Sequence, residues 1–234
     1  MKDIIGQALL DYYHGNYSED ILTETNISEE DELPLPYLFR SYDEMPAIEQ
    51  KALDLAKGNI LDVGCGAGSH SLYLQEKGFD VLGIDTSEGA IEVCKLRGLQ
   101  KAECIDFLTL DNKQFDTILL LMNGTGIFQN LDNTSKYLQH LKSLLNPKGQ
   151  ILIDSSDLQY MYDSTEEGGI MVPADRYYGE LEFTMRYKGM ESEPLDWLYL
   201  DEKLFQEICA ENNFDFEVIT RGENFDYLAK LKNS

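Results

Sequence analysis

Three glycines at alternate positions, Gly64, Gly66 and Gly68, follow the strand-like run 60–63 in this chain of 234 residues. Glycine is needed where φ is positive or where a side chain would block the close approach of a ligand. Cys65 lies between the first two glycines, where a small residue is required. The spacing therefore indicates a loop whose backbone contacts a nucleotide-like cofactor.

A carboxylate stands where it could complete such a site. A helix is predicted over residues 69–77, and the apolar strand 81–84 that follows it ends on Asp85, 21 positions beyond Gly64. An acid at the end of the second strand can accept hydrogen bonds from ribose hydroxyls. The alternative is a helix N-cap, although Thr86 and the serine after it are also available for capping.

The glycine spacing differs from the dinucleotide-binding fingerprint. That fingerprint has its third glycine three residues after the second, where a pyrophosphate meets the N-terminus of a helix. Here Ser69 occupies that position and Gly68 comes one residue early. Pyrophosphate is therefore not the expected ligand, and an NAD-type enzyme stays an alternative.

The loop and its carboxylates resemble those of the class I S-adenosylmethionine-dependent methyltransferases. The first motif of that family, acid-x-Gly-x-Gly-x-Gly, is matched by Asp62 and the three glycines. Asp85 matches the family's ribose-binding acid, and Asp106–Phe107, after the third strand, matches its adenine-binding pair. The resemblance covers residues 51–155 and, more loosely, the C-terminal end. It implies S-adenosylmethionine as the cofactor and S-adenosylhomocysteine as the product.

The resemblance also implies a role for each matched residue. Asp85, with Thr86 beside it, would bind the ribose hydroxyls, while Asp106 would face the adenine amino group. Phe107 would donate its backbone N–H to the adenine ring, and the glycine loop, Cys65 included, would lie against the methionyl part and the ribose. Asp62 would orient the loop or, through water, the ammonium group of the cofactor. An ordinary turn residue is the alternative for Asp106.

Catalysis in such a site would depend mainly on position. The cofactor carries an activated methyl group, so the protein has to hold a nucleophile in line at ~3 Å from that carbon. His70, in the first turn of the predicted helix, is a candidate base near its unperturbed pKa of ~6.5, with a packed or solvent-facing histidine as the alternative. Asn123, after the fourth strand, could line the cofactor and methyl-transfer pocket or merely form a turn. The acceptor atom, whether O, N, S or C, stays open.

The segments around these residues predict the α/β class. We expect one domain, 1–234, with a Rossmann-like doubly wound, mostly parallel seven-stranded sheet and an antiparallel last strand. An N-terminal helical cap and an inserted β-hairpin lid would complete it. The expected parts are the cap (1–45), the cofactor-binding core (46–155), the lid insertion (156–200), and a C-terminal helix with a hairpin (201–234).

The cap is expected to hold a helix near residues 2–13, an acidic loop, and a segment that Pro34 and Pro36 keep extended. A turn at 147–149 is expected to lead into the fifth strand, 150–155. The fourth strand is predicted over 115–122.

Ligands of open α/β sheets lie outside the carboxyl ends of the strands, so the insertion is placed to form a substrate lid. Four residues of the cap and the insertion are the expected substrate contacts: Tyr37, Arg40, Trp197 and Tyr199. The aromatic residues could form a cage for a cationic or flat substrate, or they could pack the lid onto the core. Arg40 could bind the carboxylate of the cofactor or offset nearby acids.

The formal net charge of −24 argues against nucleic acid as a partner. Binding to phosphates would need a strongly segregated basic patch, and the sequence has no basic run. We therefore expect a small-molecule substrate. The acidic block 29–32 is interpreted as a solvated surface, with recruitment of a cationic partner as the alternative.

The cysteines at 65, 94, 104 and 209 show neither metal-ligand nor redox spacing, so no metal is expected. Reduced thiols fit a cytoplasmic protein, and Cys94 and Cys104 fall in elements predicted to be buried. No run approaches ~18 apolar residues, so neither a membrane span nor a signal peptide is expected. The oligomeric state is open, and a non-catalytic protein that binds the cofactor is the second alternative to an enzyme.

Overall fold

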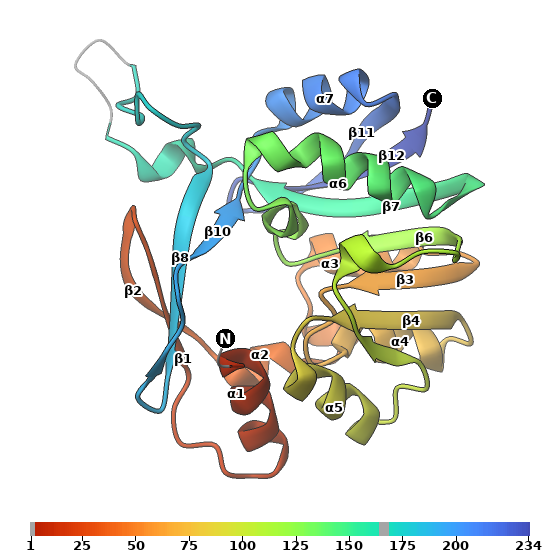
Figure 1. Ribbon diagram of the computed structural model, residues 1–234, viewed down its shortest axis with the longest axis vertical. Helices are drawn as coiled ribbons and strands as arrows, with labels where there is room; N and C mark the ends of the chain where they lie inside the picture. Colours follow the sequence, from red (N-terminus) through yellow and green to blue (C-terminus); the bar gives the residue numbers. More distant parts are fainter. Residues whose placement is uncertain (1–2, 164–168) are drawn as a thin grey trace.

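The computed structural model describes residues 3–163 and 169–234. Seven strands form its core sheet, in the order β11-β12-β7-β6-β3-β4-β5 (Figure 1). Strands β3 to β7 run parallel, and β12 is antiparallel to both of its neighbours, which confirms the predicted fold class. The strands are β3 (Asn59–Val63), β4 (Asp80–Asp85), β5 (Ala102–Cys104), β6 (Phe115–Leu120), β7 (Leu145–Ser156), β11 (Phe214–Arg221) and β12 (Asp226–Asn233).

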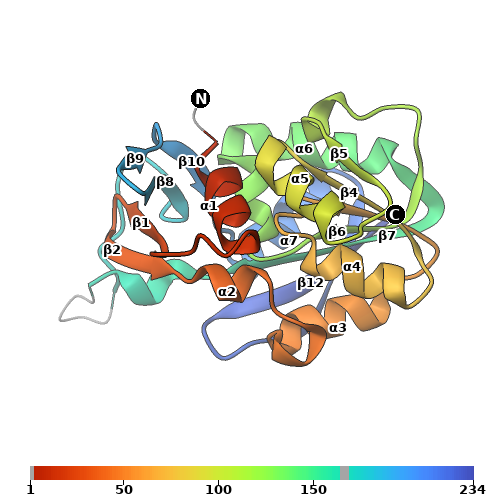
Figure 2. The ribbon, with the colours of Figure 1, turned by 90° about the horizontal axis from the view of Figure 1, so that it is seen from below.

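Helices cover both faces of this sheet because its inner strands are apolar on both sides. Successive residues of β3 join opposite cores: Ile60 packs with α3 and α4, and Leu61 packs with α6 and α7. Figure 2 shows α3 and α6 on opposite sides of the sheet. The covering helices are α3 (Ala47–Leu55), α4 (Ser69–Glu76), α6 (Leu131–Ser143) and α7 (Glu202–Glu211).

A second sheet, here called the lid sheet, has the strand order β10-β8-β1-β2, with β9 paired to β8. The pair β8–β10 is the predicted lid hairpin. The prediction of an acidic loop in the cap is wrong, because that segment forms the hairpin β1–β2. The lid-sheet strands are β1 (Ile21–Thr25), β2 (Ser28–Leu33), β8 (Glu180–Tyr187), β9 (Met190–Glu191) and β10 (Leu195–Leu198).

Pairing across the chain explains why this hairpin forms. Strand β1 pairs antiparallel with β8, from Leu22 opposite Arg186 to Thr25 opposite Phe183. The Arg186 guanidinium also contacts the carboxylates of Glu24 and Glu30. The acidic strands are therefore stabilised by a partner strand and a cation that lie far along the sequence.

Two proline segments also differ from the expectation. The segment around Pro34 and Pro36 is not extended, because Leu35–Leu38 form the short helix α2 with Pro34 as its N-cap. Proline is tolerated in the first turn of a helix, where its missing N–H is not needed. The turn expected at 147–149 lies inside β7, where the register against β6 shifts.

The N-terminal helix α1 (Ile4–Tyr13) packs against α5 (Glu88–Leu96) through Gly6 and Gly89. The start predicted for α1 at residue 2 lies outside the described residues. Asp3 joins the two helices: its Oδ1 accepts from the Gly6 N–H at 2.8 Å, and its Oδ2 accepts from the Gly89 N–H at 2.9 Å. One carboxylate thus caps α1 and bonds the first turn of α5.

Within 3–163 and 169–234, no helix has both the length and the apolar character that crossing a bilayer requires.

Because α1 and α5 approach closely, adding one methyl group at Gly89 should lower the stability of the fold. A Cβ at Gly89 would lie 2.5 Å from the Gly6 Cα, so Gly89→Ala should destabilise the fold by about 1–3 kcal/mol through overpacking. Urea denaturation measures this difference. Glu92→Ala, at an exposed position of α5, is the control and should change stability by less than about 0.5 kcal/mol. Equal stability of the two variants would contradict the predicted contact.

Candidate functional site

The glycine loop connects β3 to α4 and leaves room for a ligand. Gly66 has φ of 52°, and a Cβ added there would meet no atom within 4 Å. Gly68 has φ of 81° and caps α4, and a Cβ there would lie 2.9 Å from the Cys94 Sγ. Both positions therefore require glycine, and the space beside Gly66 is open.

Asp85 links this loop to the end of β4. Its Oδ2 accepts from the Gly66 N–H at 3.0 Å, and its Oδ1 accepts from the Ser87 N–H at 2.9 Å. Ser87, not Asp85, caps α5 with its side chain, and Thr86 between them is exposed. Burial raises the pKa of Asp85, although the backbone N–H groups oppose the rise. The carboxylate therefore lies at the loop, as the ribose role requires.

Asp62 connects the strand before the glycine loop to the helix after it. Its side chain is buried, and its Oδ2 accepts from the Ser71 hydroxyl at 2.6 Å. Burial raises the pKa of Asp62. The contacts join β3 to the first turn of α4, so they fix the loop between these elements.

Asp106 and Phe107 begin a 3₁₀ turn after β5. The Asp106 carboxylate is exposed and accepts from the Leu108 N–H at 2.9 Å, which is the turn role. The Phe107 ring is buried against Tyr137 and His140. A ligand at this point would meet the Phe107 backbone and not its ring, and the adenine roles of both residues stay predictions.

The turn after β6 is strained. Met122 and Asn123 both have positive φ, 65° and 61°, so β6 ends at Leu120 and not at residue 122. Non-glycine residues in this region cost on the order of 1–3 kcal/mol each, and they cluster at functional sites. The Asn123 Nδ2 donates to the Leu198 backbone oxygen at 3.3 Å, while the buried Asn123 Oδ1 has no hydrogen-bond partner within the described part of the chain.

The lid sheet is fixed to this turn by Trp197. A Cβ at Gly126 would lie 2.1 Å from the Trp197 ring, so the indole lies directly on that glycine. The Thr125 hydroxyl donates to the Leu198 backbone oxygen at 2.9 Å. Trp197 therefore packs the lid onto the core, which was the alternative to a substrate cage. Tyr199 follows β10 and is partly buried.

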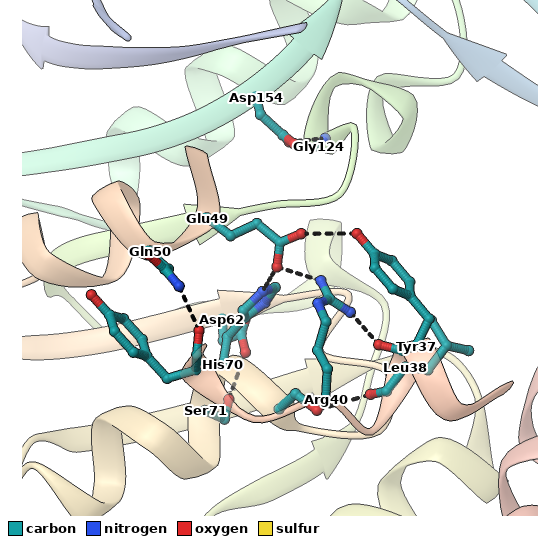
Figure 3. Close-up of polar contacts among 12 residues, drawn as sticks. Tyr37, Leu38, Arg40, Glu49, Gln50, Asp62, His70, Ser71, Gly124 and Asp154 are labelled. Atoms are coloured by element: carbon teal, nitrogen blue, oxygen red, sulfur yellow. Dashed lines mark hydrogen bonds and ion pairs between the residues drawn. The ribbon is translucent and has the colours of Figure 1, made fainter. Parts of the chain in front are cut away.

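A buried ionic network lies beside the glycine loop, with Glu49 at its centre (Figure 3). The Glu49 Oε2 contacts both the Arg40 guanidinium and the His70 Nε2, the latter at 2.6 Å. The Arg40 guanidinium lies 4.0 Å above the Tyr37 ring and donates to the Tyr37 backbone oxygen at 2.6 Å. Three candidates from the sequence therefore meet at one carboxylate: Tyr37, Arg40 and His70. That carboxylate, Glu49, was not among the candidates.

The charges of this network compensate one another. Burial opposes ionisation of Glu49, but the hydrogen bonds and charges of His70 and Arg40 outweigh it and lower the Glu49 pKa. Glu49 thus stays a carboxylate and offsets the buried Arg40. His70 has the packed position that was the alternative to a base. The Arg40 Nε is buried and lacks a partner among the described residues.

Asp154, at the carboxyl end of β7, is a second acid that the sequence analysis missed (Figure 3). Its side chain is buried, and its Oδ1 accepts from the Gly124 N–H at 2.8 Å. Burial raises the pKa of Asp154 to about 6, against the effect of the backbone N–H groups of Gly124 and Asn123. Glu49 adds to the rise and His70 opposes it.

Both missed acids had a sequence signal. Glu49 shares the apolar face of its helix with Ile48, Ala52 and Leu53, and a charged residue on such a face needs partners. Asp154 interrupts the apolar run of a central strand at its carboxyl end, where sites are formed. Neither signal predicts which residues contact Glu49 or Asp154, because those residues lie on other helices, strands and loops.

Two of the four cysteines lie together in the core. Cys65 and Cys94 are buried with their sulfurs 3.8 Å apart, and the hydrogen bond to Cys94, followed by burial, raises the pKa of the Cys65 thiol. Cys104 is exposed, so its predicted burial is wrong. Among the residues that the structure describes, no group of three or more His, Cys, Asp or Glu is placed to hold a metal ion.

The raised pKa of Asp154 predicts a pH-dependent cost to stability. Its folded-state pKa of about 6 exceeds the unfolded value, so the folded state binds the proton more tightly between pH ~4 and ~6, and stability falls as pH rises through that window. Asp154→Asn keeps an oxygen for Gly124 and removes the charge. It should be more stable than the unmodified protein at pH 7.5, by up to about 3 kcal/mol, and should lose this advantage near pH 4.

Urea denaturation at the two pH values measures this difference. Asp215→Asn, at an exposed position of β11, removes the same charge and is the control. An Asp154→Asn protein that is no more stable than the control at pH 7.5 would show that the carboxylate is not destabilised by burial.

Comparison with known proteins agrees with this geometry. A family model described as a methyltransferase domain matches residues 37–228. The chain is similar to a putative methyltransferase, YqeM, of Bacillus subtilis strain 168, with 30% identity over 105 residues, 42% of each protein. It is also similar to a tRNA U34 carboxymethyltransferase of Idiomarina loihiensis, with 29% identity over 135 residues, 53% of this chain and 39% of that protein. The matches span less than half the length of these curated relatives.

The crystal structure of a methyltransferase from Bacteroides fragilis, solved in complex with S-adenosylhomocysteine, matches the whole chain. It is 42% identical, with a TM-score of 0.92, and the match covers 100% of this chain and 95% of that one. Together with the family model and the glycine loop, this similarity shows that the chain belongs to the class I S-adenosylmethionine-dependent methyltransferases.

Proposed function

We propose that the protein transfers the methyl group of S-adenosylmethionine to a small molecule held between the core sheet and the lid sheet. The observation that carries the proposal is the contact between β10 and the turn after β6, made by Trp197 on Gly126. An acceptor has to reach that turn beside the lid. The lid carries the acidic strand β2 and the chain has a net charge of −24, which disfavours a nucleic acid as the acceptor.

The residues present fit the cofactor. The open space at Gly66 and the carboxylate of Asp85 would take its ribose, while Asp106 and the Phe107 backbone would take its adenine. Two buried polar atoms without a partner in the described chain, Arg40 Nε and Asn123 Oδ1, suit the carboxylate and the ammonium of an amino acid. A donor and an acceptor are thus both available for the methionyl part.

The chemistry of transfer comes from the cofactor, which when bound supplies an electrophilic methyl group on a sulfonium. The residues of this chain bind the cofactor and the acceptor and orient them. Glu49 holds Arg40 and His70 in place, and Asp154 holds the Gly124 N–H in the strained turn. Trp197 packs the lid on that turn. Orientation of this kind supplies a large part of catalysis when no side chain forms a covalent bond.

The ribose role of Asp85 predicts a loss of cofactor affinity. Asp85→Ala removes two acceptor oxygens and should weaken S-adenosylmethionine and S-adenosylhomocysteine binding by about 1–3 kcal/mol, as measured by calorimetry. Asp80→Ala, at the exposed opposite end of β4, is the matched control and should bind both as the unmodified protein does. Unchanged affinity in Asp85→Ala would exclude the ribose role.

Transfer itself can be followed with a radiolabelled methyl group on S-adenosylmethionine. The protein is incubated either with the low-molecular-mass fraction of a cell extract or with total tRNA. We expect label in the small-molecule fraction. The Asp85→Ala variant should give none when the cofactor concentration lies below the raised dissociation constant of that variant. Label on tRNA alone would contradict a small-molecule acceptor. No label in either fraction would favour a non-catalytic protein that binds the cofactor.

A further inference from the structure

The order of the core strands divides the site into two halves. The chain leaves β3 toward β4 and β5 on one side, and continues with β6 and β7 on the other side of β3. Ligands of such sheets bind where the order reverses. The glycine loop and Asp85 occupy the side of β3 and β4, whereas Asp154 ends β7. The second half is therefore left for the methyl acceptor.

Asp154 is a buried carboxylate without a cation. Its hydrogen-bond donors are neutral backbone N–H groups, that of Gly124 among them, and the ion pairs found among the described residues do not include it. The nearby basic side chains, Arg40 and His70, are both bonded to Glu49. A buried charge without a partner is costly, so the position favours a ligand that brings a positive charge.

Two tyrosines respond to the charge of this carboxylate. Burial raises the pKa of Tyr199 and of Tyr37, and the charge of Asp154 adds to each rise. The backbone on both sides of Tyr199 is fixed: the Leu200 N–H donates at 2.8 Å to Ser155, next to Asp154, and the Leu198 oxygen accepts from the turn after β6. Tyr199 is thus held beside the end of β7.

The aromatic residues continue toward the surface. Tyr160 stacks on Phe225, with ring centroids 4.8 Å apart, and it adds to the rise in the Tyr199 pKa that burial causes. These outer rings are 54% and 62% exposed, so they offer an apolar surface to solvent. Aromatic faces stabilise cations, and a carboxylate among them forms the kind of site that binds organic ammonium groups.

We propose that the methyl acceptor is an amine with an apolar body, and that Asp154 binds its ammonium group beside Tyr199. The inference rests on the proposed function, because it names the substrate class of the same site. A neutral hydroxyl or thioether acceptor would leave the buried carboxylate uncompensated. An ammonium group supplies the missing charge and several hydrogen-bond donors.

The same carboxylate completes the proton balance. The ammonium nitrogen has no lone pair until it loses one proton, which the Asp154 carboxylate accepts. The nitrogen lone pair then forms the new N–C bond as the bond between the methyl carbon and the sulfur breaks, and the sulfur keeps that electron pair. The positive charge passes from the sulfur to the methylated nitrogen. Asp154 afterwards releases its proton to water, so every atom and charge is accounted for.

Calorimetry on the protein saturated with S-adenosylhomocysteine tests the inference. The probes are 2-phenylethylamine, which is an ammonium ion at pH 7.5, and its neutral counterpart 2-phenylethanol. The amine should bind at least ten-fold more tightly than the alcohol. Asp154→Asn should abolish this preference by weakening the amine alone, whereas Asp215→Asn, with the same loss of charge on exposed β11, should retain it. Tyr199→Leu should weaken the amine several-fold.

Three results would overturn the amine inference: equal binding of the two probes, no binding of either, or an amine affinity that Asp154→Asn leaves unchanged. Binding of S-adenosylhomocysteine is measured first in every variant and shows that the protein is folded and that the cofactor half is intact. If that binding holds and the amine preference is absent, the amine inference fails while methyl transfer to another small molecule stands.

Discussion

The turn after β6 is the point on which the rest of the site depends. Met122 and Asn123 adopt left-handed backbone conformations one after the other, which costs free energy that the turn alone does not recover. The compensating contacts come from two other elements, the Asp154 carboxylate on β7 and the Leu198 backbone on β10. The core sheet and the lid sheet therefore meet at this turn, because each of them supplies a hydrogen bond that stabilises it.

Two buried carboxylates near the turn have opposite environments. Glu49 is bonded to Arg40 and His70, and its pKa is lowered, so its charge is fixed and internally offset. Asp154 has backbone donors and aromatic neighbours, and its pKa is raised to about 6. Differences of this kind between neighbouring acids separate a structural group from one that exchanges protons or binds a charged ligand. The charge of Glu49 is therefore offset within the protein, whereas Asp154 is the acid to which the proposal assigns the charged acceptor.

Much of the cofactor half could be predicted from the sequence because its signals are local. The loop from Gly64 to Gly68 and the acid that ends β4 lie within one β-α-β unit, so spacing alone places them together. The hairpin β1–β2 could not be predicted in this way. Its strands form because β1 pairs with β8, about 160 residues later in the chain, and acidic residues have low intrinsic β-propensity.

The residues of the proposed acceptor site were harder to predict from the sequence. Asp154, Tyr37 and Tyr199 come from three elements separated by long stretches of chain, and no spacing rule connects them. The sequence placed the two tyrosines among the expected substrate contacts, one in the cap and one in the insertion, but it gave no reason to join them to an acid on β7. The relation of Tyr199 to Asp154 follows from a contact between the two sheets, in which the Leu200 N–H donates to the Ser155 hydroxyl at 2.8 Å.

The N-terminal segment connects the two halves. Helix α1 is attached to the cofactor half, since Asp3 bonds the first turn of α5 directly after Asp85, and its charge contributes to the raised pKa of that acid. The hairpin that follows α1 pairs with β8 in the lid, and α2 then carries the chain to Arg40. The segment of residues 3–40, which lies outside the α/β core, therefore connects the glycine-loop side of the core to the lid sheet.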